Sequence, residues 1–568
     1  MQSAINLMVG GEAGQGVQSV GFLLSKALAR GGYHVFADQD YESRVRGGHN
    51  FFRIRAGEKK VEAISETLDI LVALNRESIE LHRGEVAGAG VIIYDGEKNE
   101  INPSDKKLFS VPLEKLAEKA GGSIMINTVA FGAALGLVAY DTAIMGEVLR
   151  HRFPKKAVAD NNVKAATAGY KYAQKNYKGE FLRLNTISDI KRMLITGNDA
   201  LALGAIAAGC KFMSAYPMTP ASSIMEYFAA KSEEMGLVMV HAEDEIAAVN
   251  MAIGAGYAGV RAMTATSGSG FCLMVEGLGM AGITETPVVI VDAQRPGPAV
   301  GLPTRTEQGD LQFVLYAHQG DFPRAVLAPA TVEDNFWMAV KAFNLAEKYQ
   351  LPVIILTDHH LASSYATVDR FDHSKVVIER GTFFQRGKGR KEEYKRYKVT
   401  PSGVSPRALP GQKSVLVVAD SDEHDEFGHM IEEAHIRTEQ VQKRLRKIFG
   451  LKNDMELPQI YGHKKAEVTL IGWGGTCGAI REASDILNKD GIKVNVLQLN
   501  ELWPFPGETV ISALGNTNKA FVIESNAVGQ LARLIRTETG KEVSKILKFD
   551  GRPFTPADIV QRIKKEVC

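Results

Sequence analysis

The feature that most constrains the fold is an alternation of short apolar segments with amphipathic ones between residues 192 and 375. Helix-like NDALALGAIAAG precedes strand-like CKFMSAYP, and the same order returns in SSIMEYFAAKSEEMG and LVMVHAED. It continues through EIAAVNMAIGAGYAG and RAMTATSG to PVVIVDAQ. Apolar strands that alternate with amphipathic helices predict a parallel sheet covered on both faces. We therefore expect an α/β protein.

Changes in composition divide the chain further. Residues 376–460 are charged and turn-rich, and they include HIRTEQVQKRLRKIFG, a basic amphipathic helix that we expect to be a solvated face or a subunit contact. The segments on either side return to strand–helix alternation. The sequence thus predicts three parallel-sheet α/β domains at 1–190, 191–375 and 461–568, with a charged connecting region and helix at 376–460. The first begins as a nucleotide-binding-type strand, glycine turn and helix.

Bulk charge and apolar content exclude several classes of protein. Among 568 residues, 67 Lys and Arg oppose 66 Asp and Glu, so the net charge of +1 predicts neither a nucleic-acid nor an anionic-membrane partner. No apolar run approaches the ~20 residues of a membrane helix, and the start lacks a signal-peptide pattern. We expect a cytoplasmic protein. The four scattered cysteines form no CxxC, so neither a zinc site nor an iron–sulfur ligand set is predicted.

The stretch YPMTPASS at 216–223 predicts a ligand site. Pro217 and Pro220 restrict the backbone on both sides of Thr219, which holds its hydroxyl at the end of a strand. Ser222 and Ser223 stand where helix N-caps belong. In open α/β sheets, ligands bind at the carboxyl ends of strands. A purely structural cap would explain the serines but not the two prolines.

Three acids follow at the next strand-to-helix junction, Glu243, Asp244 and Glu245. One of them is a candidate for a desolvated functional carboxyl, and all three equally suit the N-terminal end of a helix. Composition does not choose among them.

Two arginines in Pro/Gly-framed loops are candidate anion ligands. Arg305 in GLPTR suits bidentate pairing with a carboxylate, and Arg295 in QRPG is the alternative. The nearby Asp358, His359 and His360 are consecutive, so they predict a structural strand end rather than a metal site.

The N-terminal turn GGEAGQG is a loose relative of a dinucleotide fingerprint. Its Gly11, Gly14 and Gly16 lack the GxGxxG spacing, although Asp38 or Asp40 follows where a ribose hydroxyl is held in that fold. A turn without a ligand explains it nearly as well. Beyond it, Arg44, Arg46, Gly47 and Gly48 suit a carboxylate or phosphate, or else a solvated loop.

Taken together, these motifs resemble the α subunit of the 2-oxoacid:ferredoxin oxidoreductases. The resemblance is carried by YPMTP, by EDE with IAA and GAGYAG, and by GLPTR. GGEAGQGVQS with YESRVRGGHNFF resembles that family's γ domain, fused here ahead of a pyrimidine-binding-type domain. WPFP with IESNAVGQL resembles its transketolase C-terminal-like domain, and DEHDEFG with QKRLRK resembles the connecting region. The order matches over nearly the full length.

The resemblance implies oxidative decarboxylation of a 2-oxoacid with coenzyme A, with electrons passed to ferredoxin, a reaction that reverses as CO2 fixation. It implies thiamine diphosphate, shared with a β subunit that carries the Mg2+–diphosphate site and a 4Fe-4S iron–sulfur cluster. The chain itself contains no GDG followed by NN, so it holds half of an active site in an expected (αβ)2 assembly. The γ–α fusion favours 2-oxoglutarate, giving succinyl-CoA; pyruvate or a broad 2-oxoacid range is the alternative.

The resemblance also assigns roles to residues. Glu245, chosen by the E-x8-G pattern that ends at Gly254, matches the acid that hydrogen-bonds the aminopyrimidine ring, a role that burial would favour. Thr219 matches the clamp threonine and Arg305 the arginine that holds the substrate carboxylate. Tyr216, Pro217 and Thr219 are expected to bind the cofactor together with Glu245, and the expected substrate or coenzyme A contacts are Arg44, Arg46, Gly47, Gly48 and Arg295.

Two other functions fit the sequence less well. A NAD(P)-dependent dehydrogenase built on the glycine turn leaves YPMTP unexplained. A non-catalytic scaffold subunit predicts that Glu245 and Arg305 can be replaced without effect on turnover.

Overall fold

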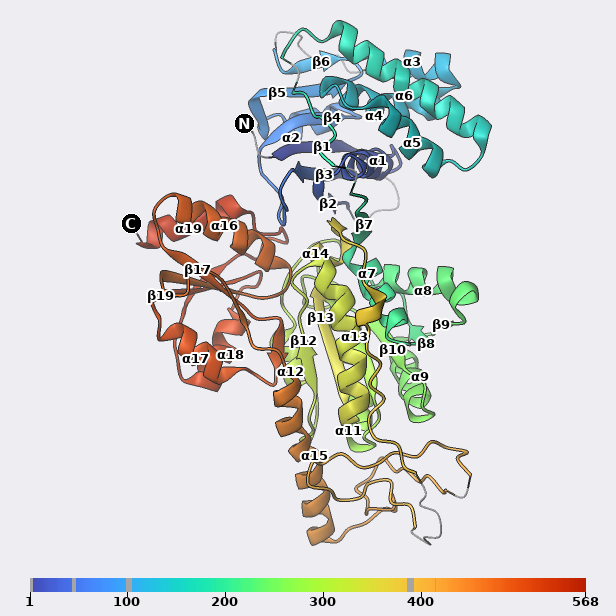
Figure 1. Ribbon diagram of the computed structural model, residues 1–568, viewed down its shortest axis with the longest axis vertical. Helices are drawn as coiled ribbons and strands as arrows, with labels where there is room; N and C mark the ends of the chain where they lie inside the picture. Colours follow the sequence, from blue (N-terminus) through green and yellow to red (C-terminus); the bar gives the residue numbers. More distant parts are fainter. Residues whose placement is uncertain are drawn as a thin grey trace. The chain divides into compact units, whose positions relative to one another are not determined.

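The computed structural model describes residues 4–42, 47–98, 105–180, 182–188, 190–385, 393–413 and 415–567 (Figure 1). These residues form three β-sheets within two compact units. Unit 1 comprises Met1–Thr196, Ser363–Phe371 and Thr555–Asp558, and unit 2 comprises Gly197–Ala362, Asp372–Phe554 and Ile559–Cys568. The α/β class with three sheets is confirmed: the two sheets of unit 2 are mostly parallel, and the sheet of unit 1 mixes parallel and antiparallel pairs.

Unit 1 contains an eight-stranded sheet in the order β6-β5-β4-β1-β3-β2-β14-β7 (Figure 1). Its strands are β1 (Ala4–Glu12), β2 (His34–Asp40), β3 (His49–Gly57), β4 (Leu68–Ala73), β5 (Val86–Tyr94), β6 (Leu108–Ser110), β7 (Met193–Thr196) and β14 (Tyr365–Val368). Its helices are α1 (Val17–Arg30), α2 (Arg76–His82), α3 (Leu113–Ala120), the short η1 (Ser123–Met125), α4 (Ile126–Leu137), α5 (Thr142–Arg152) and α6 (Lys156–Asn176).

Alternation along β1 explains why this sheet is covered on both faces. Leu7 and Val9 enter the large core that includes residues of α1 and α4, whereas Met8 packs on the opposite face with Ile79 of α2. β4 is parallel to β1, but β3 lies between β1 and β2 and is antiparallel to both. The expected strand–helix–strand unit therefore differs from a dinucleotide-binding half-fold, in which the two strands are parallel neighbours.

The two ends of the segment predicted as the second domain join this first sheet. β14 pairs antiparallel with β2 and with β7. Pairing between strands distant in sequence leaves no local signal, because the alternation of apolar residues is the same whichever sheet a strand joins.

The first sheet of unit 2 has seven strands in the order β18-β12-β13-β11-β10-β8-β9. They are β8 (Phe212–Ala215), β9 (Val238–His241), β10 (Ala262–Thr266), β11 (Val288–Gln294), β12 (Ala325–Leu327), β13 (Pro352–Asp358) and β18 (Glu501–Trp503). All neighbouring pairs are parallel except β12 with β18. The helices are α7 (Gly197–Ala207), α8 (Ser222–Met235), α9 (Glu245–Tyr257), α10 (Gly268–Leu273), α11 (Val275–Ile283), α12 (Leu311–Tyr316), α13 (Val332–Tyr349), α14 (His359–Ser363) and the short η2 (His373–Lys375).

The second sheet of unit 2 has five strands in the order β15-β17-β16-β19-β20. They are β15 (Gln459–Gly462), β16 (Ala466–Gly472), β17 (Val494–Gln498), β19 (Thr517–Glu524) and β20 (Ser544–Leu547), accompanied by η3 (Gly474–Thr476), α16 (Cys477–Lys489), α17 (Gly507–Leu514), α18 (Gln530–Thr539) and α19 (Pro556–Val567). One apolar cluster joins the two sheets, from Val288 on β11 to the fully buried Trp473 after β16.

The basic helix of the connecting region is α15 (Ala434–Asp454). The expectation of a solvated face or subunit contact is wrong for part of it, since Lys443 and Lys447 are buried. Their ammonium groups each lie 2.5 Å from a carboxylate oxygen of the buried Glu285. The sequence pattern missed this because the counter-charge, Glu285, lies far away in the chain, just after α11.

Within the described ranges, no single helix is long and apolar enough to cross a membrane. The segments Leu113–Ala120 and Ser123–Leu137 pass that test only as a pair, with a bend of 117° between them.

Candidate active site

The YPMTP turn connects the carboxyl end of β8 to α8 in unit 2. It is tied down from α7: the Asn198 side-chain amide donates to the carbonyl of Pro220 at 2.8 Å and to the Ser223 hydroxyl at 2.9 Å. The expected N-capping by Ser222 and Ser223 is wrong, because Ala221 occupies the N-cap position in helical conformation and no side chain caps α8. The sequence offered no local signal for Asn198, which lies in an otherwise apolar helix.

Burial distinguishes the three acids before α9. Glu243 is exposed, and Asp244 is the N-cap, with its carboxylate accepting from the Ala247 amide at 2.7 Å. Glu245, the first helical residue, is only 4% exposed. Its carboxyl lies against the backbone of α10, since a Cβ placed on Gly270 would be 2.5 Å from the Glu245 Oε1. Gly270 therefore makes room for this carboxyl.

The two candidate arginines have different partners. Arg295, directly after β11, is 8% exposed and donates from Nη1 to the carbonyl of Thr219 at 2.8 Å. Arg305 donates from Nη1 to the carbonyl of Thr304, next to it in the chain, at 3.0 Å. The structure thus brings Arg295 against the YPMTP turn, and none of the described hydrogen bonds of Arg305 does so.

Near Arg295 are two carboxyl groups that the sequence analysis did not single out. Asp292 lies on β11 and is completely buried, and Asp310 precedes α12. Burial, and then the charge of Asp310, raise the pKa of Asp292 well above its ordinary value. Burial, and then Glu307, raise the pKa of Asp310 to about 7 against the opposing charge of Arg295. In sequence, each was one acid among many.

Asp358, at the end of β13, is structural, as the sequence predicts. Its carboxylate accepts from the backbone of Leu361 at 2.9 Å and of Gly475 at 2.7 Å, so it holds α14 and the start of the last domain. In the part of the chain that the structure describes, no group of His, Cys, Asp and Glu is arranged to hold a metal ion.

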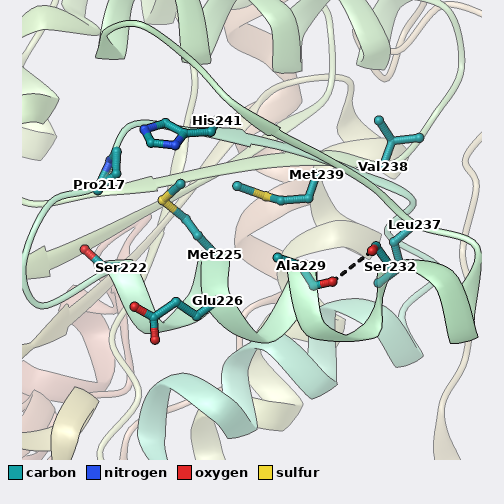
Figure 2. A pocket seen from close by; sticks show the side chains of 10 residues that line it. All are labelled: Pro217, Ser222, Met225, Glu226, Ala229, Ser232, Leu237, Val238, Met239 and His241. Carbon is teal, nitrogen blue, oxygen red and sulfur yellow. Dashed lines mark hydrogen bonds between the residues drawn. The ribbon is translucent and has the colours of Figure 1, made fainter.

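Beside the turn, a groove of about 620 Å³ runs between α8 and the edge strand β9 (Figure 2). Met225 from the helix and Met239 from the strand both point into it, and Pro217 and His241 stand at the end nearer the YPMTP turn. The groove is apolar for most of its length. It therefore offers a surface suited to apolar contact beside the turn.

In unit 1, the glycine turn lies at the edge of a second cavity, of about 560 Å³. Gly14 and Gly16 have φ of 92° and 84°, and a Cβ on Gly16 would be 1.9 Å from the side-chain amide of Asn127. Neither Asp38 nor Asp40 lines this cavity; both lie on β2.

The candidate anion loop between β2 and β3 is described only in part. Arg44 and Arg46 lie outside the described residues. Gly47 and Gly48, with φ of 79° and 81°, precede β3.

Comparison with known proteins places all three segments of the chain. Residues 203–443 match the family described as pyruvate flavodoxin/ferredoxin oxidoreductase, thiamine diP-bdg, residues 6–172 match pyruvate ferredoxin/flavodoxin oxidoreductase, and residues 466–559 match pyruvate:ferredoxin oxidoreductase core domain II.

Individual relatives match over nearly the full length. The 2-oxoacid:ferredoxin oxidoreductase subunit alpha of a Sulfolobus species is 32% identical over 99% of this chain and 97% of its own. The 2-oxoglutarate oxidoreductase subunit KorA of Mycobacterium tuberculosis is 29% identical over 98% and 90%. A solved structure of the 2-oxoglutarate:ferredoxin oxidoreductase from Magnetococcus marinus, with 2-oxoglutarate, coenzyme A and succinyl-CoA bound, is 34% identical, covers 100% of both chains and has a TM-score of 0.94. The chain belongs to the 2-oxoacid:ferredoxin oxidoreductase family and corresponds to its α subunit.

Proposed function

We propose that this chain is the α subunit of an enzyme that oxidatively decarboxylates 2-oxoglutarate with coenzyme A. The products are succinyl-CoA, carbon dioxide and two electrons, which pass to ferredoxin. The choice of 2-oxoglutarate is supported by the Magnetococcus marinus enzyme, which superposes over the whole chain, and by the relatives named KorA. Pyruvate, or a broad range of 2-oxoacids, is the second candidate, favoured by the family names of the three matched segments.

The observation that carries the proposal is the position of Glu245. Its carboxyl is withdrawn from water at the start of α9 and lies against a glycine of α10. β8 and β10 are parallel neighbours in the sheet. The YPMTP turn follows β8 and α10 follows β10, so both lie at the carboxyl end of the same sheet. This is where ligands bind in open α/β sheets.

These residues fit thiamine diphosphate. A buried carboxyl suits a hydrogen bond to a ring nitrogen, and glycine at position 270 leaves the space that a larger side chain would fill. When bound, thiamine diphosphate supplies the nucleophilic carbon and the electron sink for decarboxylation. Glu245 would form the hydrogen bond to the aminopyrimidine ring, and Tyr216, Pro217 and Thr219 would shape the wall beside it.

Arg295 is the cation best placed to orient the 2-oxoacid carboxylate. Its hydrogen bond to the Thr219 carbonyl holds the guanidinium against the YPMTP turn, where Thr219 is partly exposed. Fixing one end of the substrate beside the reacting carbon is an orientation effect worth several kcal/mol. The carboxylate-binding role of Arg305, and the contacts of Arg44, Arg46, Gly47 and Gly48 with substrate or coenzyme A, stay predictions.

A β subunit completes the proposed site. Large apolar side chains of β9, α9 and α10 are exposed in this chain, among them Val238 at 53%, Ile246 at 50% and Leu273 at 49%. Exposed apolar side chains of this size suit burial against a protein partner. We propose that this partner holds Mg2+ and the diphosphate together with a 4Fe-4S cluster, that it forms an (αβ)2 assembly in the cytoplasm, and that ferredoxin docks on the assembly.

The test is anaerobic co-purification with the β subunit and assay of coenzyme A-dependent ferredoxin reduction. We expect 2-oxoglutarate to exceed pyruvate by about tenfold or more in kcat/KM. Glu245→Gln should lower kcat by about 100-fold or more, since it removes an acid–base group, with thiamine and iron contents unchanged.

Glu243→Gln is the matched control, because this neighbouring carboxylate is exposed, and it should leave kcat unaltered. Faster turnover of pyruvate would reject the substrate assignment. Full activity in Glu245→Gln would reject the proposed site.

A further inference from the structure

The loop between β11 and α12, residues 295–310, begins beside the YPMTP turn; we call it the arginine loop after its two arginines. Its first residue, Arg295, donates to the Thr219 carbonyl at 2.8 Å. Its last residue, Asp310, donates from the backbone amide to the side-chain carbonyl of Gln294 at 3.0 Å. The two ends of the loop are therefore tied together next to the proposed site.

Burial alternates along the second half of the arginine loop. Thr304, Thr306 and Gln308 are buried, whereas Arg305 and Glu307 are only partly buried. Such alternation is typical of an extended segment that is packed on one side. The question is what holds the buried side.

The buried side lies across the five-stranded sheet of unit 2. Gln308 donates from Nε2 to the carbonyl of Trp473, directly after β16, at 2.7 Å. It also exchanges two bonds with the backbone of Ser525, directly after β19: its Oε1 accepts from the amide at 3.0 Å, and its own amide donates to the carbonyl at 2.7 Å. The amide of Thr306 donates to the carbonyl of Gly551, in the segment after β20, at 3.3 Å. Because β16, β19 and β20 are parallel neighbours, the loop crosses their carboxyl ends.

A second glutamine makes the reciprocal contact. Gln530, the first residue of α18, donates from Nε2 to the carbonyl of Gly309 and accepts at Oε1 from the amide of Gln312 at 2.8 Å. Asn526 donates from its side-chain amide to the backbone carbonyl of Gln308 at 3.0 Å. One glutamine thus binds the backbone of the five-stranded sheet, and the other binds the backbone at the end of the loop. We call Gln308, Asn526 and Gln530 the glutamine latch.

Two glycines allow the latched loop to pack closely on both sides. A Cβ on Gly551 would lie 3.1 Å from the Arg305 Cβ, so the stem of this arginine packs against the segment after β20. A Cβ on Gly268 would lie 2.5 Å from the Asp310 Oδ2, so the end of the loop packs against α10, the helix that also borders Glu245. A shift of the loop would therefore reach the proposed site.

We propose that the glutamine latch positions the arginine loop, so that the last α/β segment, residues 466–559, sets the affinity of the enzyme for its 2-oxoacid. The carboxyl ends of strands, where an open α/β sheet binds ligands, here bind a loop of the chain itself. All three latch side chains are buried, so each broken bond leaves a buried polar group unsatisfied. The inference gives a role to the IESNAVGQL motif, which contains Asn526 and Gln530. It rests on the proposed function, in which an arginine of this loop holds the substrate carboxylate.

The test replaces Gln530 by methionine, which has a similar volume and makes neither hydrogen bond. In the assembled enzyme, Gln530→Met should raise KM for 2-oxoglutarate about tenfold, because apparent affinity scales with the fraction of molecules whose loop is in place. The values of kcat, KM for coenzyme A and thiamine content should stay unchanged. Gln308→Met is the second variant and should act in the same direction.

Gln498→Met is the matched control. Gln498 is a buried glutamine of β17 whose side chain bonds Arg481 at 3.1 Å and Asn500 at 2.8 Å, away from the loop. Its replacement should leave KM for 2-oxoglutarate at the natural value. A natural KM in Gln530→Met and Gln308→Met, or a fall in kcat without a rise in KM, would mean that the latch is only structural and would overturn the inference.

A second measurement is independent of turnover. Hydrogen exchange followed by mass spectrometry should show faster exchange of the backbone amides of residues 302–312 in Gln530→Met than in the natural enzyme, and natural exchange there in Gln498→Met. Unchanged exchange in Gln530→Met would also overturn the inference. If the natural enzyme turns over no 2-oxoacid, it is the proposed function that fails, and the exchange of these amides still decides whether the latch holds the loop.

Discussion

Glu285 and Asp292 are both completely buried in unit 2, one before β11 and the other on it, yet the pKa values of their carboxyl groups are shifted in opposite directions. Glu285 lies 2.5 Å from the ammonium groups of both Lys443 and Lys447. Asp292 has no partner for either oxygen. Burial alone would raise the pKa of Glu285, but the two lysines and Arg396 hold it well below its ordinary value. For Asp292, burial and Asp310 both act upward.

The difference shows that counter-charges, and not depth, decide the charge of a buried acid. The carboxylate of Glu285 pairs with cations from α15, and it thereby links the connecting region to the sheet. Where the chain brings a second carboxyl, the pKa of the buried acid is raised instead. Perturbed groups of the second kind gather at functional sites, whereas satisfied ion pairs are most often structural.

The sharpest way to break this comparison is to neutralise Glu285. Glu285→Gln leaves the buried Lys443 and Lys447 without their counter-charge, which should cost about 3–5 kcal/mol of unfolding free energy. Equilibrium urea unfolding of the full chain measures it. An unchanged midpoint would mean that the buried ion pairs contribute nothing to holding α15.

The next effect concerns the glycine beside Glu245. In Gly270→Ala the new methyl group would lie 2.5 Å from the Glu245 Oε1 and 2.0 Å from the Thr266 hydroxyl, so the carboxyl must move. A displacement near 1 Å should lower kcat of the assembled enzyme by about 100-fold.

Gly279→Ala on α11 is the control for that change, since nothing lies within 4 Å of its added methyl group. Equal activity of the two variants would show that the position of the Glu245 carboxyl does not matter. Thermal unfolding should distinguish a displaced carboxyl from a misfolded chain.

The smallest expected effect is a gain in unfolding free energy, opposite in sign to the loss expected for Glu285→Gln. Asp292 has a raised pKa in the folded chain, so its contribution to stability is complete in acid and is lost as pH rises. Asp292→Asn does not titrate, so it should gain stability relative to the natural protein between pH 5 and pH 8, by at most about 1.36 kcal/mol per pH unit. Urea unfolding at the two pH values checks it. A loss of stability at pH 8 would mean that Asp292 is charged and paired.

The sequence analysis predicted best those features that depend on neighbouring residues in the chain. The YPMTP turn at a strand end, the helix that begins at Glu245 and the structural role of Asp358 follow from local patterns. It went wrong where partners are distant. Ser223 is not a cap, and Lys443 and Lys447 of α15 are not solvated, because Asn198 and Glu285 reach them from other elements.

By itself, the sequence determined the α/β class, the positions of most strands and helices and the family, since periodicity and motif order are properties of consecutive residues. Only the tertiary structure decided which of three acids is buried, which of two arginines meets Thr219, and that Asp292 and Asp310 share one end of a sheet. The physical reason is that burial and charge pairing arise between strands and loops that are far apart in the chain. No local pattern records which of them the fold will bring together.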